Sequence, residues 1–419
     1  MKAPVDPEFI SNFQGLSKAL LKSLITAAKK ASIERIAIVG GVIRDELIHI
    51  IHNQTIKNFN DLDLIIEGSP EIFAHQIKQL LGESRVSINR VNSNYQTIEL
   101  TIDGICIDIA RARLETYPHL AKNPATSNTS IENDLKRRDF TINSIAFDLK
   151  KNQLIDPCNG KDAILNRSLE LNHSLSISED PTRVIRAARY STRLNFQLSS
   201  ASLHQIEETI NSWPWDWTSN KRSEAPPPAL GTRFGMEVEL LLEKEKWAKC
   251  LTKLQEWGAL VLLDQKIQQE KYLNRKLTWA SRLGVQRLTA LVATAKDPCA
   301  LASRLQLTQT QQNLLKTSVD LNENLDSIYK SQAYINWLPS QWCELIESHT
   351  LNPNAIAISI SLGKPLWRYL LHWWGRWRHI KSKTTAQNLM KKGWSEGPEL
   401  GMELKRLRDM ELNKNIKLK

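Results

Sequence analysis

Cysteine is scarce in this chain of 419 residues, and its five cysteines form neither a Cys-x-x-Cys pair nor a Cys/His cluster with zinc-site spacing. Such scattered cysteines are typical of a reduced, intracellular protein. The sequence also lacks a His-Asp pair, which argues against a metal-dependent phosphohydrolase. It has no G-x-G-x-x-G fingerprint, which argues against a dinucleotide-binding fold.

Long apolar runs are missing as well. The most apolar late stretch, residues 355–371, is interrupted by a glycine, a lysine, a proline and an arginine, so we expect no membrane-spanning segment. The first ten residues, MKAPVDPEFI, include two prolines and two acids and lack the apolar core of a signal peptide. We therefore expect a cytoplasmic protein without a membrane anchor.

The chain is basic, with 56 lysines and arginines against 45 acidic residues and a net charge of +11. This charge favours polyanionic partners, among which nucleic acid is the first candidate. A hydrophobic fraction of 41% and a charged fraction of 24% are ordinary for a globular protein. Because one hydrophobic core rarely supports a chain of this length, we expect several domains.

The first 150 residues alternate between short β-branched runs and segments of helical period, which predicts an α+β unit. The predicted strands are 35–40, 61–67, 97–102 and 105–110, and the predicted helices are 42–52 and 70–81. Asp103-Gly104 between the last two strands is a strong hairpin signal, so part of the sheet should be antiparallel. Residues 118–129 look like a polar loop.

From residue 131 onward the pattern is mostly helical. A stretch rich in tryptophan and proline at residues 213–228 indicates a linker between helical units. The later predicted helices are 236–253, 265–283, 308–325, 341–348 and 367–380.

Gly40 and Gly41 lie where the first predicted strand becomes a helix, and Arg44 follows one turn later. Backbone amides without side chains and a helix N-terminus can approach a phosphate there, and Arg44 adds positive charge. A tight turn is the more common role of such a glycine pair.

Asp61 and Asp63 alternate with leucines in the second predicted strand, so both carboxylates lie on one face. Such a pair is repulsive unless cations neutralise it, and Mg²⁺ suits hard oxygen ligands and holds nucleotide phosphates through one or two carboxylates. Asp108, in a later strand, could be a third carboxylate that accepts a proton or completes the coordination. The alternative is that these acids are merely solvated strand residues.

Two arginines, two aspartates and an asparagine fall within residues 134–143, which we predict to be a short helix. Arginine forks bind phosphate oxygens, while aspartate and asparagine suit ribose hydroxyls. A solvated charge run is the competing interpretation, although Phe140, Ile142 and Ile145 indicate that the segment is partly packed.

Arg183, Arg186 and Arg189 are three residues apart, so they lie along one helix face and repel one another unless an anion joins them. Asp180 and Arg183 stand at positions i and i+3, where a carboxylate and a guanidinium can present a combined hydrogen-bonding edge. Such an edge could choose CTP and ATP without a template. An ordinary ion pair within the helix is the alternative.

Four stretches, in this order, resemble the bacterial-type (class II) tRNA nucleotidyltransferase and poly(A) polymerase family of the polymerase-beta-like superfamily. They are GGVIRD at 40–45, DLDL at 61–64, RRDFTIN at 137–143 and EDPTRVIRAARY at 179–190. The resemblance implies a polymerase-beta-like α+β head at residues 1–150. It further implies an all-α neck at 151–212, body at 213–330 and RNA-binding tail at 331–419.

The same resemblance implies that Asp61 and Asp63 bind Mg²⁺ and that Asp108 joins them in catalysis. The nucleotide-binding residues that it implies are Gly41, Arg44, Arg138, Asp139, Asp180, Arg183, Arg186 and Arg189. Among these, Asp180 and Arg183 would read the base.

The implied activity is Mg²⁺-dependent, template-independent addition of CMP and AMP, from CTP and ATP, to the 3′ end of tRNA with release of pyrophosphate. A poly(A) polymerase, a CC-only enzyme or an A-only enzyme would share these motifs, and the 118–129 loop, which influences A addition in this family, leaves the choice open. A catalytically silent RNA-binding protein is the alternative from another class. No protein partner is implied.

The C-terminal residues 389–401 also resemble the tail of these enzymes. Cations that could contact an RNA backbone there are Arg376, Arg378, Lys381, Lys383, Lys391, Lys392, Lys405, Arg406 and Arg408. Three nearby tryptophans at helical spacing, Trp373, Trp374 and Trp377, are expected to belong to the core.

Overall fold

A computed structural model describes residues 16–54, 61–119, 121–212 and 226–414. These residues form two compact units: the first contains the chain up to residue 212 together with 227–230, and the second contains 226 and 231–414. The linker expected at 213–228 lies mostly outside the described residues. The four-part division into head, neck, body and tail stays a prediction.

A seven-stranded mixed sheet is the centre of the first unit, in the order β3-β4-β5-β2-β1-β8-β9. Its strands are β1 (Ile36–Val39), β2 (Asp61–Ile66), β3 (Val86–Asn92), β4 (Thr97–Ile102), β5 (Ile105–Arg111), β8 (Ala146–Asp148) and β9 (Gln153–Ile155). β2 and β5 run parallel, and the other neighbouring pairs of this sheet run antiparallel. The predicted α+β unit with an antiparallel hairpin is confirmed.

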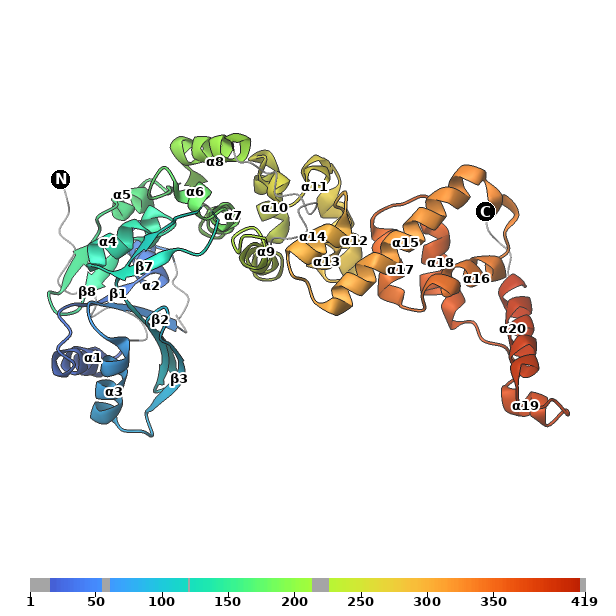
Figure 1. Cartoon of the computed structure of the whole chain (residues 1–419), viewed down its shortest axis with the longest axis horizontal. Coiled ribbons are helices and arrows are strands. Elements are labelled where there is room, and N and C mark those ends of the chain that lie inside the picture. Colours follow the sequence, from blue (N-terminus) through green and yellow to red (C-terminus); the bar gives the residue numbers. More distant parts are fainter. Residues whose placement is uncertain (1–15, 55–60, 120, 213–225, 415–419) are drawn as a thin grey trace. The chain divides into compact units, whose positions relative to one another are not determined.

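The helices of the first unit are α1 (Lys18–Lys30), α2 (Gly41–His52), α3 (Pro70–Leu81), α4 (Ile131–Lys136), α5 (Gly160–Leu165), α6 (Ser176–Glu179), α7 (Thr182–Leu194) and α8 (Ser200–Ser212). Figure 1 shows α1 and α3 side by side, and the two helices are in contact. α3 also packs on β3, β4 and β5. A two-stranded parallel pair, β10 (Ser168–Leu169) with β11 (Gln197–Leu198), joins the segments that flank α6 and α7.

The two faces of β2 have different surroundings. Leu62 is fully buried on one face. On the other face Ile65 belongs to a buried cluster with Ile131 of α4, whereas Asp61 and Asp63, farther along the same face, are exposed. One end of this face is therefore packed beneath α4, and the open end carries the two acids.

Two predicted elements of this unit are wrong in part. Instead of a helix over 134–143, α4 ends at Lys136, Arg138 and Asp139 lie in a turn, and a 3₁₀ helix, η1, covers Thr141–Asn143. Instead of a loop over 118–129, β7 (Ala125–Asn128) pairs with β6 (Arg113–Thr116). Residue 120 of that predicted loop lies outside the described residues.

The second unit is helical throughout its described part. Its α-helices are α9 (Thr232–Lys244), α10 (Trp247–Glu256), α11 (Gln265–Gln269), α12 (Leu273–Arg282), α13 (Arg287–Ala293), α14 (Pro298–Arg304), α15 (Gln309–Ser331), α16 (Pro339–His349), α17 (Pro353–Ser361), α18 (Trp367–Gly375), α19 (Ala386–Met390) and α20 (Pro398–Asn413). Three 3₁₀ helices complete it: η2 (Ala259–Leu262), η3 (Ala333–Asn336) and η4 (Trp377–His379).

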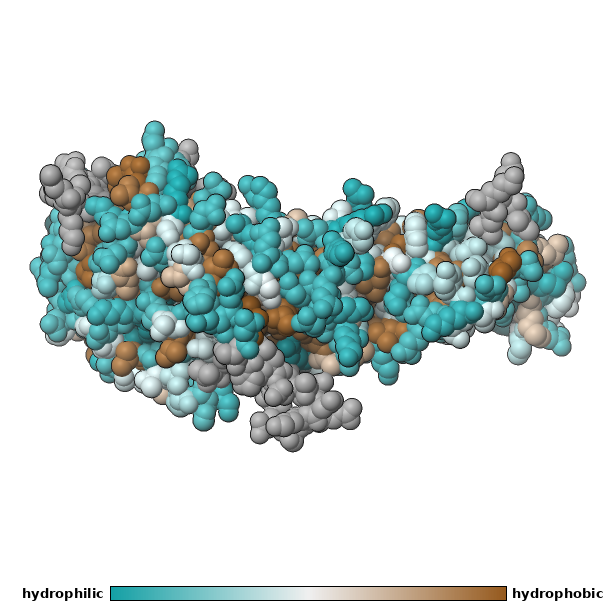
Figure 2. Space-filling view, turned by 90° about the horizontal axis from the view of Figure 1, so that it is seen from above, coloured by the Kyte–Doolittle hydropathy of each residue, from teal (hydrophilic) through white to brown (hydrophobic). Residues whose placement is uncertain are grey.

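The predicted helices at 236–253 and 265–283 are each broken in two, and extended backbone at Glu245 separates α9 from α10. A Thr308–Gln311 capping box starts α15 near its predicted beginning. Within the described residues, no helix combines the length and the apolar character needed to cross a bilayer. The face seen in Figure 2 is mostly hydrophilic, with hydrophobic residues in small scattered groups.

Candidate functional site

The register of the sheet gathers acidic side chains on the open face of β2. Asp63 pairs with Asp108 of β5, and Asp108 pairs in turn with Glu99 of β4. Because directly paired residues on neighbouring strands point to the same face, these three acids share one face with Asp61. The structure thus brings together the three carboxylates predicted for catalysis and adds a fourth, Glu99.

The electrostatics of this face show that the acids are close enough to interact. Asp63 is exposed by surface area, yet protein atoms exclude much of the surrounding water and raise its pKa to about 6. The positive charge of Arg138 opposes this rise, and the negative charges of Asp108 and Asp61 add to it. Burial, followed by the charges of Glu99 and Asp61, also raises the pKa of Asp108.

Gly40 connects this acid cluster to the start of α2. It has φ of 86°, a left-handed conformation that favours glycine, and a Cβ atom added there would lie 2.9 Å from Asp63 Oδ2. The pairing of Val39 with Asp63 explains the closeness, since Gly40 is the next residue along β1. The N-terminus of α2 therefore lies directly beside the Asp63 carboxylate.

Arg44 is buried one turn into α2 and is held by several groups. Its Nε donates to Asp45 Oδ1 at 2.8 Å, and its Nη1 donates to Asn143 Oδ1 at 2.8 Å. The guanidinium also lies 5.3 Å from the centre of the Tyr190 ring, to which Arg186 and Arg193 come within 5.6 and 5.8 Å. Three cations from α2 and α7 thus surround one aromatic ring.

Asp139 ties the turn after α4 to α7. Its Oδ2 accepts from Arg186 Nε and Nη2 at 2.7 Å, and its Oδ1 accepts from Asn143 Nδ2 at 3.1 Å. Burial opposes ionisation of Asp139, but the charge of Arg186 and these hydrogen bonds outweigh burial and lower its pKa. A continuous chain of hydrogen bonds therefore joins Arg44, Asn143, Asp139 and Arg186.

Arg138 and Arg137, neighbours in the same turn, are anchored by one buried acid. Asp134 Oδ2 accepts from Arg138 Nη2 at 3.2 Å, while Asp134 Oδ1 accepts from Arg137 Nη2 at 2.6 Å. Arg138 also acts electrostatically on Asp63, as noted above, so it lies between α4 and the acid face. Arg137 continues to Glu115 of β6 at 2.8 Å, which makes it a structural link.

The structure places Asp180 and Arg183 at the start of α7. Asp180 Oδ1 accepts from the Thr182 backbone N–H at 3.1 Å and from its hydroxyl at 2.6 Å. Arg183 is buried and donates from Nη1 to Ser176 Oγ at 2.7 Å. Arg189, one turn beyond Arg186 on the same helix, is half-buried.

Besides Glu99, the sequence reasoning gave no role to two of these residues, Tyr190 and Ser176. The ring of Tyr190 had a detectable signal, because Tyr190 follows Arg186 by four residues and so lies on the same helix face. Ser176 had none, since a single serine before a charged helix is an unremarkable pattern.

The donor set fits a divalent cation only in part. Among the described residues, no group of three or more His, Cys, Asp or Glu side chains is arranged to hold a metal ion. Two carboxylates on one open face suit a cation that takes its remaining ligands from phosphates and water, as Mg²⁺ does. The repulsion that helps to raise the pKa of Asp63 is what such a cation would relieve.

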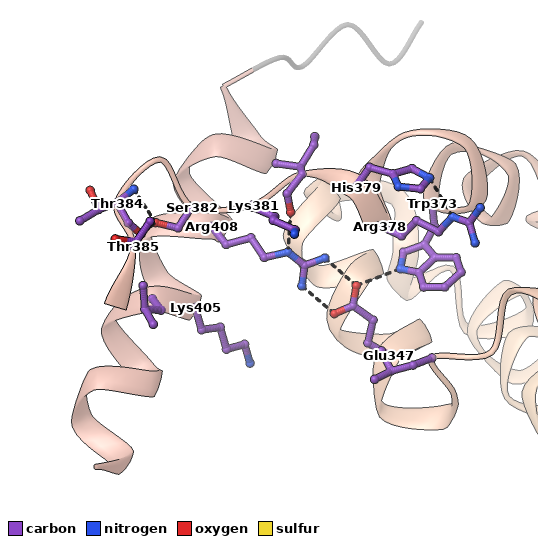
Figure 3. A pocket seen from close by; sticks show the side chains of 13 residues that line it. Glu347, Trp373, Arg378, His379, Lys381, Ser382, Thr384, Thr385, Lys405 and Arg408 are labelled. Atoms are coloured by element: carbon purple, nitrogen blue, oxygen red, sulfur yellow. Dashed lines mark hydrogen bonds and ion pairs between the residues drawn. The ribbon is translucent and has the colours of Figure 1, made fainter. Parts of the chain in front are cut away.

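The C-terminal part of the second unit contains a basic pocket of about 660 Å³ between α16, α18 and α20. Figure 3 shows Arg408 and Trp373 converging on Glu347, whose carboxylate accepts two hydrogen bonds from Arg408 at 2.7 Å and one from Trp373 at 3.0 Å. Lys405 is likewise paired, with Glu344 at 2.7 Å. Several of the predicted RNA-contacting cations are therefore partly neutralised by neighbouring acids.

Trp373 and Trp377 are buried, as expected, whereas Trp374 is half-buried and its ring lies 4.9 Å from the Arg378 guanidinium. Lys381, Lys391 and Lys392 are exposed. Their charges, like that of the exposed Arg376, are accessible to a polyanion.

The part of the chain that contains this site is similar to known proteins. Residues 36–170, which contain the acid face and the Arg44–Asp139 chain, match the poly(A) polymerase head domain. The A-adding tRNA nucleotidyltransferase of Aquifex aeolicus (strain VF5) is 29% identical over 252 residues, which are 58% of this chain and 28% of that protein. The CC-adding tRNA nucleotidyltransferase of Deinococcus radiodurans is 27% identical over 319 residues, 75% of this chain and 78% of that protein.

A solved structure of a CCA-adding enzyme in apo form II has a TM-score of 0.71 at 22% identity, over 99% of this chain and 96% of that one, which shows the shared fold. The chain spans less than two thirds of the first curated relatives it matches, namely 28%, 26% and 57% of their lengths. Residues 36–170 therefore form a poly(A) polymerase head domain, the sequence similarity to tRNA nucleotidyltransferases continues beyond it, and the chain shares the fold of a CCA-adding enzyme.

Proposed function

We propose that this protein adds CMP and AMP, from CTP and ATP, to the 3′ end of tRNA without a template and so completes the CCA end. The observation that carries the proposal is the juxtaposition of Asp61 and Asp63 with the N-terminus of α2 at the open end of one sheet face. Relatives named A-adding, CC-adding and CCA-adding enzymes support the reaction class.

In this proposal Asp61 and Asp63 hold Mg²⁺, which would activate the terminal 3′-hydroxyl and neutralise the departing pyrophosphate. Asp108 would accept a proton on the same face, a role that its raised pKa supports. The backbone at Gly41 and the guanidinium of Arg44 receive the triphosphate at the helix N-terminus. Arg138 and Asp139 position the phosphates and ribose, and the chain through Asn143 keeps these groups in fixed orientation.

The direct test uses purified protein, Mg²⁺ and tRNA transcripts that end before CCA, after C and after CC, each with CTP, ATP or both. We expect growth that stops at CCA when products are resolved at single-nucleotide length. Products that stop at CC, or reaction only with CC ends, would assign a CC-only or A-only enzyme instead. A long ladder of A would indicate a poly(A) polymerase, and absence of any addition would contradict the proposal.

Base selection is expected to depend on Asp180. Replacing Asp180 with alanine removes the acceptor for the amino group of C or A, which we expect to cost about 2 kcal/mol of discrimination, or roughly 30-fold. The measurement is kcat/KM for CTP and ATP against UTP and GTP. Unchanged exclusion of UTP and GTP would remove Asp180 from base reading.

Nucleotide binding is expected to depend on the Tyr190 ring. Tyr190→Leu removes the surface that Arg44 and Arg186 face, and we expect KM for CTP to rise about tenfold, because each cation–π contact is worth about 0.5–1 kcal/mol. Tyr190→Phe keeps the ring and should change KM less than about threefold. Tyr95→Leu is the matched control, since Tyr95 faces Arg113 at 5.5 Å on an exposed part of the head.

A further inference from the structure

Arg183 is held by hydrogen bonds to two segments: Ser176, which lies outside the four nucleotide motifs, and Arg137, the first residue of the motif at 137–143. Ser176, which is fully buried, accepts twice from Arg183 Nη1: through Oγ at 2.7 Å and through its backbone carbonyl at 3.2 Å. On the other side, the carbonyl oxygen of Arg137 accepts from Arg183 Nη2 at 3.1 Å. Two nitrogens of one planar group are thus bound to two different segments of the chain.

Ser176 is itself anchored. The Ser176 backbone N–H donates to the carbonyl oxygen of His173 at 3.1 Å, and Gln205 of α8 donates to the same oxygen at 2.8 Å. The His173 ring lies 3.5 Å from Arg183 Nη1. Burial and the charge of Arg183 lower the pKa of His173 to about 4, so its ring is neutral near pH 7 and does not repel the guanidinium.

These hydrogen bonds determine the orientation of the Arg183 guanidinium more than they determine whether it lies at the site. A guanidinium has five N–H groups in one plane, and binding both terminal nitrogens determines the plane in which its other N–H groups point. Reading a base edge requires that plane to be correct, since a tilted fork can still attract a nucleotide but distinguishes one edge from another poorly.

We infer that Ser176 is a positioning residue that orients Arg183, and that nucleotide selection depends on its hydroxyl. The inference rests on the proposed function, in which Arg183 reads the base. It adds a residue from α6 to the determinants of specificity.

The experiment compares wild type, Ser176→Ala, Arg183→Lys and the double variant for kcat/KM with CTP, ATP, UTP and GTP on a tRNA transcript lacking CCA. Ser178→Ala is the matched control, because Ser178 lies on the same helix and its hydroxyl donates to the Leu175 carbonyl. We expect Ser176→Ala to lower discrimination against UTP and GTP about tenfold, from loss of one hydrogen bond to a charged group. Discrimination by Ser178→Ala should equal that of wild type.

In the Arg183→Lys background, Ser176→Ala should have no further effect on selectivity, since lysine cannot bridge both Ser176 oxygens and the Arg137 carbonyl. Equal slowing of all four nucleotides by Ser176→Ala, or additive losses in the double variant, would overturn the inference. Thermal unfolding of each variant shows whether slowing comes from loss of folded protein. Absence of nucleotide addition by wild type would instead refute the proposed function, so the two failures are distinct.

Discussion

Asp63→Asn is expected to abolish nucleotide addition, with a loss of more than about 1,000-fold in kcat, while tRNA binding changes less than about twofold. The variant keeps the shape of the side chain but removes one of the two carboxylates that would hold Mg²⁺. Single-turnover addition to a tRNA transcript and filter binding of the same transcript measure the two quantities. We expect the same loss of kcat and the same unchanged tRNA binding for Asp61→Asn.

The same substitution should leave the folded protein as stable as wild type or more stable. Asp63 has a pKa of about 6 in the fold against 3.8 ordinarily, so between these values the folded chain holds more protons than the unfolded chain. The free energy of unfolding therefore falls as pH rises through this window, and asparagine removes that loss. In EDTA, the gain in Tm of Asp63→Asn over wild type should be larger at pH 7.5 than at pH 4.

Glu99→Gln is the matched control for both measurements. Glu99 lies on the same sheet face, two strands from β2, and its carboxylate accepts from Asn89 at 3.2 Å. We expect its activity to stay within about threefold of wild type. Comparable loss of activity in both variants, or substantial activity in Asp63→Asn, would contradict the assignment of Asp63 as a metal ligand.

Gly40→Ala is expected to lower kcat about 100-fold. The new methyl group would lie 2.9 Å from Asp63 Oδ2, so the carboxylate or the start of α2 must move. A misplacement of about 1 Å at a reacting centre can cost about two orders of magnitude in rate. Gly40 also combines φ of 86° with ψ of −139°, a conformation that residues with a side chain rarely adopt, which adds a strain of about 1–3 kcal/mol. The measurements are kcat on a tRNA transcript and Tm.

Gly104→Ala separates these two effects. Gly104 also has φ of 86°, yet a Cβ atom there would meet no atom within 4 Å. We therefore expect a loss of stability from backbone strain with nearly normal kcat. If Gly104→Ala were as inactive as Gly40→Ala, strain alone would explain the loss and the contact with Asp63 would be unimportant.

Sequence signals predicted the elements of the head accurately where local residues determine how a helix or strand begins and ends. α3 occupies the predicted residues because Ser69 caps its first turn, Pro70 suits the first helical position, and Gly82 adopts a positive φ after its last. The Asp103-Gly104 hairpin also forms where expected, because both residues take the positive φ that a two-residue turn requires.

The errors arise where distant groups decide the backbone. The helix ends before Phe140 because Phe140 is extended and pairs with Leu171, a contact across 31 positions that no helical period reveals. β7 forms from polar residues because β6 offers it a partner.

The candidate site shows the same contrast between local signals and contacts of distant residues. The shared face of Asp61 and Asp63 follows from alternation within one strand, so the sequence alone predicted it. The proximity of Asp108 depends on which strands are neighbours, and the contact of Ser176 with Arg183 depends on the path of the chain between α5 and α7. Such contacts carry no periodic signature.

The length of the short turn between β4 and β5 sets the register of the strand that carries Asp108. Strand side chains alternate faces, so one extra residue in this turn that shifted β5 against its neighbours would turn Asp108 away from Asp63 and bring Ile107 or Ile109 in its place. This turn, which takes no part in the proposed reaction, thus determines to which face of the sheet the Asp108 carboxylate, four positions away, points. Changes in the length of this turn should lower catalytic activity before they lower the stability of the fold.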